Sequence, residues 1–211
     1  MRRPQGSVRL ILIRHALTSW NLAGRYQGRT DTALCTAGLT EAREAGAALR
    51  HTGASLVLTS PLRRARATAE AISRCLGSVP CLVDERLVEL AFGEWEGLTQ
   101  GEVRQRWPAL LREWKRVPQA VRFPGGEALH DGQRRMEEFV RRPPWADRAD
   151  RADRQCVIAV THMGPIRLAR LCADGRSLAD YRQMALQAGA AHQFDWDPPG
   201  HLRPAGLLAL T

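Results

Sequence analysis

The chain has 211 residues, of which 44% are hydrophobic and 25% are charged, and these proportions are ordinary for one globular domain. Its formal net charge of +9 would favour nucleic-acid binding, but the 31 Lys and Arg residues are spread along the whole chain without interleaved aromatic residues, so we expect an anionic small-molecule partner and no nucleic acid. No apolar run approaches the roughly 20 residues that a membrane span requires, so we expect no membrane partner either.

The first predicted strand covers residues 8–13, which are apolar at every position but Arg9 and too few for a buried helix. It leads directly into Arg14 and His15. A His at the carboxyl end of a parallel strand lies where open α/β sheets bind ligands. The following residues, 16–35, show little periodicity and are expected to form a long functional loop.

Helix-like and strand-like segments then alternate along the chain. We predict a helix from Thr36 to about residue 51, a strand at 56–59, a helix that Ser60 caps and Pro61 begins, a strand at 81–83, helices at 99–117 and 127–142, a strand at 156–160, a helix at about 165–172 and a further strand at 190–196. The Ala-Asp-Arg triplets at 146–154 are expected to form an exposed connection. This alternation predicts a three-layer α/β/α sandwich with a largely parallel sheet, in one domain with a small helical cap at about 97–145.

A second His follows a strand-like run. His162 comes after the apolar residues 156–160, as His15 comes after the first strand. Either His alone is most simply a structural residue, but the two together favour a catalytic role. The guanidinium of Arg14 offers planar donors to phosphate, and a neutral imidazole can attack phosphorus. The pattern therefore indicates phosphoryl transfer.

The cysteines give no sign of a disulfide framework or a zinc site. There are five, widely spaced and without a C-x-x-C pair. The basic N-terminus leads straight into the first strand and has no small-residue cleavage site. We therefore expect a cytoplasmic protein that uses no metal and no cofactor.

Six segments stand out in the sequence: RHALTSWN at 14–21, YQGRTD at 26–31, SPLRRARATAE at 60–70, LVELAFGEWEG at 87–97, PGGE at 124–127 and THMGPIR at 161–167. In content and order they resemble the motifs of the histidine phosphatase superfamily, the phosphoglycerate-mutase-like group. Each segment alone is a weak signal, but the ordered set is specific and covers residues 8 to about 170.

The resemblance implies a role for each of five residues. His15 would be the nucleophile and would form a phosphohistidine, which divides the displacement into two steps. Arg14, Arg63 and His162 would hold the phosphoryl oxygens. Glu89 would protonate the leaving alcohol and then take a proton from water, a role that asks for a pKa raised toward neutrality.

Arg63 is the expected pocket arginine because it lies three residues after Ser60, where the family places it. Arg64 and Arg66 are expected on the solvated face of the helix. Four further residues are candidates for substrate binding, with Met163 at the pocket mouth: Asn21, Gln27, Gly28 and Met163.

Ala16, Leu17 and Met163 depart from the family pattern, in which Gly, a polar residue and Gly are usual at these positions. We expect a phosphomonoesterase, because the segment between Glu89 and His162 is too short for the larger insertion of the mutase branch. A phosphoglycerate-type mutase and an inactive phosphate-binding protein are the alternatives. The sequence is similar to α-ribazole phosphatases and to broad-specificity phosphatases, and it leaves the substrate open.

Overall fold

The computed structural model describes residues 6–146, 156–187 and 189–210. A six-stranded sheet with the order β3-β2-β4-β1-β5-β6 forms its centre. The strands are β1 (Val8–Arg14), β2 (Val57–Thr59), β3 (Cys81–Val83), β4 (Cys156–Thr161), β5 (Ala190–Asp197) and β6 (His201–Ala209). β1 to β4 pair in parallel, whereas β5 runs antiparallel to both β1 and β6. The prediction of an α/β fold with a largely parallel sheet is confirmed.

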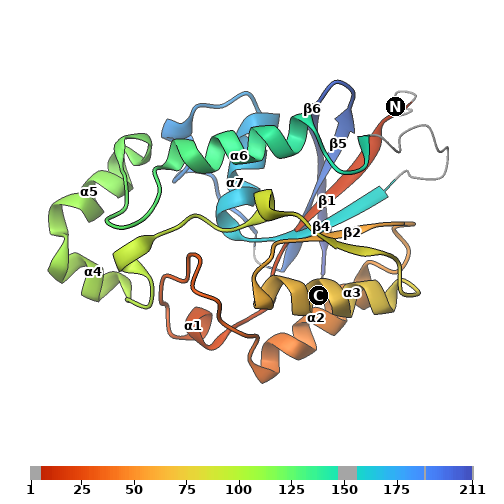
Figure 1. The fold of residues 1–211 in the computed structure, drawn as a ribbon, viewed down its shortest axis with the longest axis horizontal. Coiled ribbons are helices and arrows are strands. Elements are labelled where there is room, and N and C mark those ends of the chain that lie inside the picture. The colour runs from red at the N-terminus through yellow and green to blue at the C-terminus, as the bar shows by residue number, and fades with distance from the viewer. Residues whose placement is uncertain (1–5, 147–155, 188, 211) are drawn as a thin grey trace.

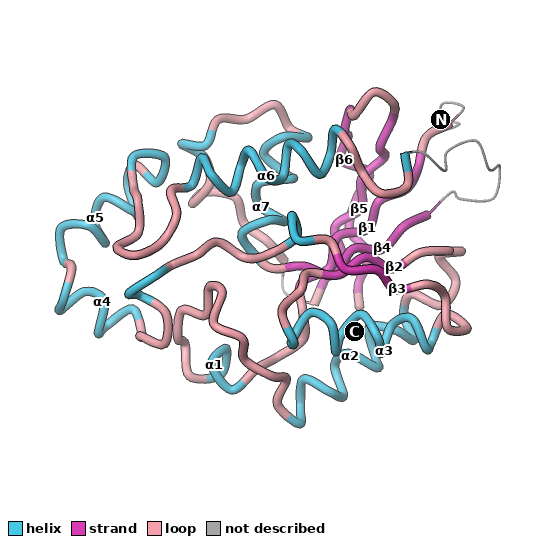
Figure 2. Tube along the Cα trace, viewed as in Figure 1, coloured by secondary structure: helices cyan, strands magenta, loops and turns pink. Residues whose placement is uncertain are grey.

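Helices cover both faces of this sheet (Figures 1 and 2). The helices are α1 (Ser19–Leu22), α2 (Thr36–Ala48), α3 (Arg63–Cys75), α4 (Gln100–Arg106), α5 (Pro108–Arg116), α6 (Leu129–Arg141) and α7 (Met163–Ala173). α2 and α3 pack together on one face, and α6 and α7 pack together on the other. α4 and α5 extend beyond the sheet at one end of the molecule.

Burial explains why the inner strands β2 and β4 are apolar up to their last residues, Thr59 and Thr161. Every residue of β2 and β4 is buried, because helices cover the sheet on both sides. β3, at the edge of the sheet, is exposed at all three of its positions. Polar residues follow the inner strands at their carboxyl ends. The site lies at this edge of the sheet.

Two predicted helices differ from expectation in their details. The helix predicted at 99–117 is two helices, because Trp107 leaves the helical conformation before Pro108 begins α5. The helix predicted from Pro61 begins at Arg63, with Leu62 rather than Ser60 at the N-cap. This second difference changes which arginine enters the site.

β6 was not predicted. Pro204 and Gly206 interrupt the pattern of its sequence, and both are tolerated because β6 lies at the edge of the sheet, opposite a register shift in β5. The Ala-Asp-Arg triplets, predicted as an exposed connection, lie outside the described residues apart from Ala146.

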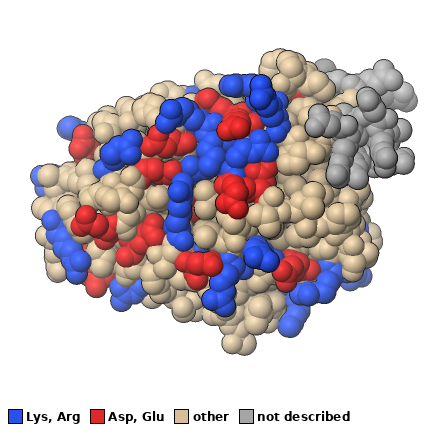
Figure 3. All heavy atoms as spheres, in the orientation of Figure 1, with Lys and Arg blue, Asp and Glu red and all other residues tan. Residues whose placement is uncertain are grey.

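Arginine and acidic side chains are interspersed on the face shown in Figure 3. Arg122 and Arg134 pair with Asp131, and Arg135 pairs with Glu127. Such pairs compensate part of the excess positive charge locally.

Among the described helices, none has the length and apolar character needed to cross a membrane.

Candidate active site

The sheet brings the two histidines together. Arg14 at the end of β1 is in register with Thr161 at the end of the parallel neighbour β4. The residues that follow, His15 and His162, leave adjacent strand ends, and their ring centroids lie 5.1 Å apart. The backbone N–H of His15 donates to the carbonyl of Thr161 at 2.9 Å, so the ladder of hydrogen bonds extends to His15 itself.

His15 is held as a neutral imidazole with a defined tautomer. Its Nδ1 lies 2.8 Å from the carbonyl oxygen of Ala16. A carbonyl only accepts, so Nδ1 carries the proton and Nε2 carries the lone pair. Burial, followed by the charges of Arg14 and Arg64, lowers the pKa of His15 to about 3. The ring therefore presents an unprotonated nitrogen at any ordinary pH.

The arginine beside His15 is Arg64. Its side chain is buried, and its Nε donates to His15 Nε2 at 3.2 Å. Its two terminal nitrogens donate to the carbonyls of Thr30 and Gly28 at 2.8 and 2.7 Å. Arg63, by contrast, is exposed. The prediction was therefore wrong for both residues: Arg63 lies outside the pocket, and Arg64 is not solvated.

The start of α3 explains the exchange. Because helical geometry begins only at Arg63, the helix face that turns toward the end of β1 carries Arg64 and, one turn later, Thr68. The hydroxyl of Thr68 accepts the N–H of Ala16 at 3.1 Å and donates to the carbonyl of Arg64 at 2.8 Å. α3 thus fixes the loop after His15 and the pocket arginine together.

His162 lies beside His15 but does not line the cavity. It is fully buried, and its Nε2 lies 2.7 Å from the hydroxyl of Ser60, at the end of β2. Its Nδ1 is buried without a hydrogen-bond partner. Burial, followed by the charge of His15, holds the pKa of His162 well below its usual range, so this ring is neutral too.

Glu89 is the buried carboxyl group of the site. Its Oε1 accepts the backbone N–H groups of Leu90 at 2.8 Å and Gly164 at 3.1 Å, whereas Oε2 has only a 3.3 Å contact with the same Gly164 N–H. Burial raises the pKa of Glu89, and the two backbone hydrogen bonds oppose that rise. Oε2, the oxygen with the weaker contact, is the natural position for a proton.

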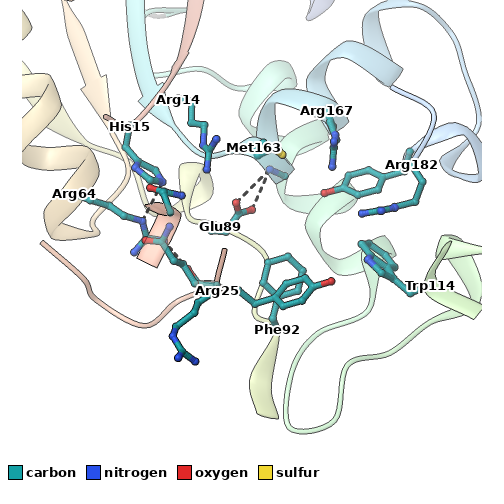
Figure 4. A pocket seen from close by; sticks show the side chains of 16 residues that line it. Arg14, His15, Arg25, Arg64, Glu89, Phe92, Trp114, Met163, Arg167 and Arg182 are labelled. Carbon is teal, nitrogen blue, oxygen red and sulfur yellow. Dashed lines mark hydrogen bonds between the residues drawn. The ribbon is translucent and has the colours of Figure 1, made fainter. Parts of the chain in front are cut away.

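Arg14, His15, Arg64 and Glu89 line a cavity of about 190 Å³. Figure 4 shows Arg14, His15 and Arg64 at one end and Glu89 in the middle. The four candidates for substrate binding also line it: Asn21, Gln27, Gly28 and Met163. The structure therefore brings together all the predicted site residues except Arg63, which is exposed; His162 does not line the cavity, but its ring lies 5.1 Å from that of His15.

The loop after His15 accommodates its unusual residues. The methyl group of Ala16 is buried against Ala42 and Ala71, and the φ angle of Ala16 is not positive. Leu17 N–H donates to Glu41 at 2.8 Å. The residue that replaces glycine is therefore a packed element of this loop.

Two glycines of the site have a steric role. A Cβ on Gly164 would lie 2.2 Å from Glu89 Oε1, and one on Gly28 would lie 2.0 Å from Glu96 Oε1. Glu96 in turn accepts the hydroxyl and N–H of Thr30 at 2.6 and 2.8 Å. Gly164 thus admits the carboxyl group of Glu89, and Gly28 lets its own loop close over Arg64.

Sequence reasoning missed a second set of lining residues. They are aromatic or basic and come from the loop after α1, from residues before and within the predicted cap, from α7 and from the segment after it: Arg25, Tyr26, Phe92, Trp114, Arg167, Tyr181 and Arg182. Arg167 and Phe92 lie inside recognised motifs, so their position was a usable signal. Nothing in the sequence pattern set Arg182 apart from the other arginines.

In the described part of the chain, no three His, Cys, Asp or Glu side chains are grouped so that they could hold a metal ion. Positive charge in the cavity comes from arginines instead.

Known proteins are similar to this chain in sequence and in fold. The family model described as "Histidine phosphatase superfamily (branch 1)" matches residues 10–202. Phosphoserine phosphatase 1 of Hydrogenobacter thermophilus is 34% identical over 169 residues, which are 79% of this chain and 75% of that protein. A 2,3-bisphosphoglycerate-dependent phosphoglycerate mutase of a Methylobacterium species is 34% identical over 173 residues, covering 79% of this chain and 80% of the mutase.

The fold is similar to that of solved enzymes. The structure of a mycobacterial glucosyl-3-phosphoglycerate phosphatase in complex with VO3 superposes with a TM-score of 0.80 at 28% identity, over 96% of this chain and 99% of that one.

Proposed function

This chain belongs to the histidine phosphatase superfamily (branch 1), and we propose that it is a phosphomonoesterase that hydrolyses a small phosphorylated metabolite through a phosphohistidine at His15. The observation that carries the proposal is the state of His15. Its Nε2 is unprotonated and lies beside the buried guanidinium of Arg64, and the residue lines a cavity of about 190 Å³. A nucleophile fixed next to a phosphate-binding group is what phosphoryl transfer needs.

In the first step, the lone pair of His15 Nε2 attacks phosphorus while the bond from phosphorus to the ester oxygen breaks. Arg14 and Arg64 stabilise the charge on the equatorial phosphoryl oxygens. Glu89, protonated because of its raised pKa, gives its proton to the leaving oxygen, and the alcohol departs.

In the second step, water attacks the phosphohistidine. Glu89, now a carboxylate, takes a proton from the water as the new bond from oxygen to phosphorus forms. The bond from Nε2 to phosphorus breaks, and inorganic phosphate leaves. The imidazole and the protonated Glu89 are restored for the next cycle.

We propose that this reaction needs no metal ion, because two arginines supply the positive charge at the phosphoryl group. Turnover is then expected to be unchanged after treatment with EDTA and dialysis. Loss of activity on chelation, restored by adding a divalent cation, would contradict this part of the proposal.

Cys35, Cys75, Cys81 and Cys172 are free thiols, and this supports a cytoplasmic location within the same proposal. The segment at about 97–145 is proposed to act as the cap, since Phe92 before it and Trp114 within it both line the cavity.

A mutase is the second candidate, favoured by the similarity to the Methylobacterium mutase. A mutase returns the phosphoryl group to its product, whereas a phosphatase gives it to water. The first experiment is therefore phosphate release from a panel of phosphomonoesters, with 3-phosphoglycerate and α-ribazole phosphate among them and His15→Ala as the blank. Release that depends on His15 supports the phosphatase. Isomerisation of 3-phosphoglycerate without release, dependent on a bisphosphate, would favour the mutase.

A further inference from the structure

The cavity contains a second group of arginines, away from His15. Arg167 comes from α7, and Arg182 comes from the segment that follows it. In Figure 4 their side chains lie near Trp114, at the end of the cavity opposite Arg14, His15 and Arg64. The cavity therefore has two positively charged ends, and only one of them is needed for the phosphoryl group.

The two arginines are held by neutral groups. Arg167 Nε donates to the carbonyl of Met184 at 3.2 Å, and its guanidinium carbon lies 5.5 Å from the ring centroid of Tyr181. The guanidinium carbon of Arg182 lies 5.6 Å from the ring centroid of Trp114. Aromatic faces and a carbonyl fix the position of a guanidinium without neutralising its charge.

These arginines also lack acidic partners. Within the described residues, neither Arg167 nor Arg182 forms an ion pair, whereas Arg25 in the same cavity pairs with Glu102 at 3.2 Å. The one described carboxyl group that lines the cavity is Glu89, and burial raises its pKa and favours its neutral form. The far end of the cavity thus has positive charge that no described side chain compensates.

Uncompensated guanidinium groups in a partly enclosed site favour an anionic ligand. A phosphoryl dianion is already matched by Arg14 and Arg64 at the His15 end. A second anionic group would find two planar donor groups in Arg167 and Arg182. Phe92 and, at the far end, Trp114 offer apolar surface to a short carbon skeleton.

We propose that the substrate is a phosphomonoester with a second anionic group, a carboxylate or another phosphoryl group, which Arg167 and Arg182 bind at the end of the cavity opposite His15. This inference rests on the proposed function and specifies its substrate class. Arg167 and Arg182 are then specificity-determining residues.

The test compares substrates that differ only in the second group. O-phosphoserine and O-phosphoethanolamine differ by one carboxylate, and 3-phosphoglycerate and glycerol 3-phosphate differ by a carboxylate against a hydroxymethyl group. Fructose 1,6-bisphosphate and fructose 6-phosphate test a second phosphoryl group. The quantity measured is the ratio of kcat/KM within each pair, and the pair with the largest ratio identifies the anion.

For the wild-type protein we expect at least one ratio of about 10 or more in favour of the substrate with the second anionic group, which is what one charge-assisted interaction supplies. Arg167→Met and Arg182→Met are each expected to reduce that ratio about tenfold, and Arg182→Lys is expected to retain part of it. Arg104→Met removes an exposed arginine from the cap helix α4 and serves as the matched control, with an unchanged ratio.

The outcomes separate this inference from the function on which it rests. Turnover of p-nitrophenyl phosphate that depends on His15, with all ratios near one in the wild type, overturns the second anionic site but leaves the phosphatase intact. Equal losses on both members of a pair in Arg182→Met and in Arg182→Lys assign these residues a structural role and also overturn it. No His15-dependent turnover of any ester overturns the proposed function, and this inference with it.

Discussion

His15 and Glu89 are both buried, and burial moves their pKa values in opposite directions. It lowers the pKa of the imidazole to about 3 and raises that of the carboxyl group, so burial favours the neutral form of each. The neutral imidazole is the nucleophile, and the neutral carboxyl group is the acid. Burial therefore favours the protonation states that both His15 and Glu89 need in the first step.

This pairing predicts the pH dependence of kcat/KM. A group is protonated below its pKa, so the acid form of Glu89 is present at low pH and is lost as pH rises through its raised pKa. For an alkyl phosphate, kcat/KM should fall on that alkaline side, whereas His15 remains competent down to about pH 3. In Glu89→Gln the alkaline limb should disappear, and kcat/KM should fall more for the alkyl phosphate than for p-nitrophenyl phosphate, whose leaving group needs less protonation. Equal losses on the two esters would remove Glu89 from this role.

Arg64 and Arg63 provide a matched pair on adjacent positions. Arg64→Met should reduce kcat/KM by about 10²- to 10³-fold, as loss of one preorganised donor does, because its buried guanidinium beside His15 is one of the two that stabilise the phosphoryl oxygens. Arg63→Met removes an exposed side chain and should change kcat/KM less than about twofold. Steady-state kinetics on one ester measures both values of kcat/KM. Comparable losses in both variants would contradict the assignment of Arg64 as the pocket arginine.

At this scale the sequence predicted residue types better than their exact positions. Arg14, His15 and Glu89 follow strand or loop positions that the motifs define closely. Arg63 was expected in the pocket because it lies three residues after Ser60, but the arginine that faces the pocket depends on where helical geometry begins, which is at Arg63 rather than at Pro61. That Arg167 and Arg182 have no carboxylate partner among the described residues is a tertiary property, which no local pattern contains.

The elements that matter for the site are the ends of β1, β2 and β4 and the first turn of α7. The parallel register aligns His15 with His162, and Ser60 at the end of β2 fixes His162. The first turn of α7 then presents the N–H of Gly164 to Glu89. A short sheet edge thus positions the nucleophile, while a helix N-terminus positions the acid.

Gly164→Ala tests the role of that helix turn. The added Cβ would lie 2.2 Å from Glu89 Oε1, so the carboxyl group must move. We expect a loss of activity with the signature of Glu89→Gln, larger for an alkyl phosphate than for p-nitrophenyl phosphate. Gly101→Ala, in α4, meets only the Thr99 hydroxyl at 3.8 Å and should leave activity unchanged. A Gly164→Ala variant with wild-type kinetics on both esters would refute this placement of Glu89.

Elements were predictable where periodicity and burial act together. The inner strands and α2, α6 and α7 follow from apolar runs or from helical spacing. The edge strand β6 does not, because an edge position tolerates Pro204 and Gly206. The break between α4 and α5 depends on a single residue, Trp107. The helical spacing of apolar residues does not predict a break of one residue.

At the scale of the whole molecule, the C-terminal strands complete the core. Trp196 in β5 is 2% exposed, and its Nε1 donates to the carbonyl of Val140 in α6 at 2.7 Å. Its ring lies 5.9 Å from that of Trp145. The antiparallel end of the sheet is thereby tied to the helical layer that also contains α7.

Trp196→Ala should therefore lower the free energy of unfolding by about 3–5 kcal/mol, since it leaves a cavity and an unpaired carbonyl. Leu207→Ala, at a position 46% exposed in β6, should change it by less than about 0.5 kcal/mol. Urea denaturation followed by circular dichroism measures both. A Trp196→Ala variant as stable as Leu207→Ala would contradict the role given to the C-terminal strands.

The central claim is the covalent phosphohistidine at His15. It is tested most directly in Glu89→Gln, in which p-nitrophenol can leave without an acid but water lacks its base, so the phosphoenzyme should accumulate. After incubation with p-nitrophenyl phosphate and an alkaline quench, mass spectrometry should find one phosphoryl group on His15, and none in the Glu89→Gln protein that also carries His15→Ala. A phosphoryl group retained in that double variant, or nitrophenol release by Glu89→Gln without any phosphoenzyme, would contradict the account.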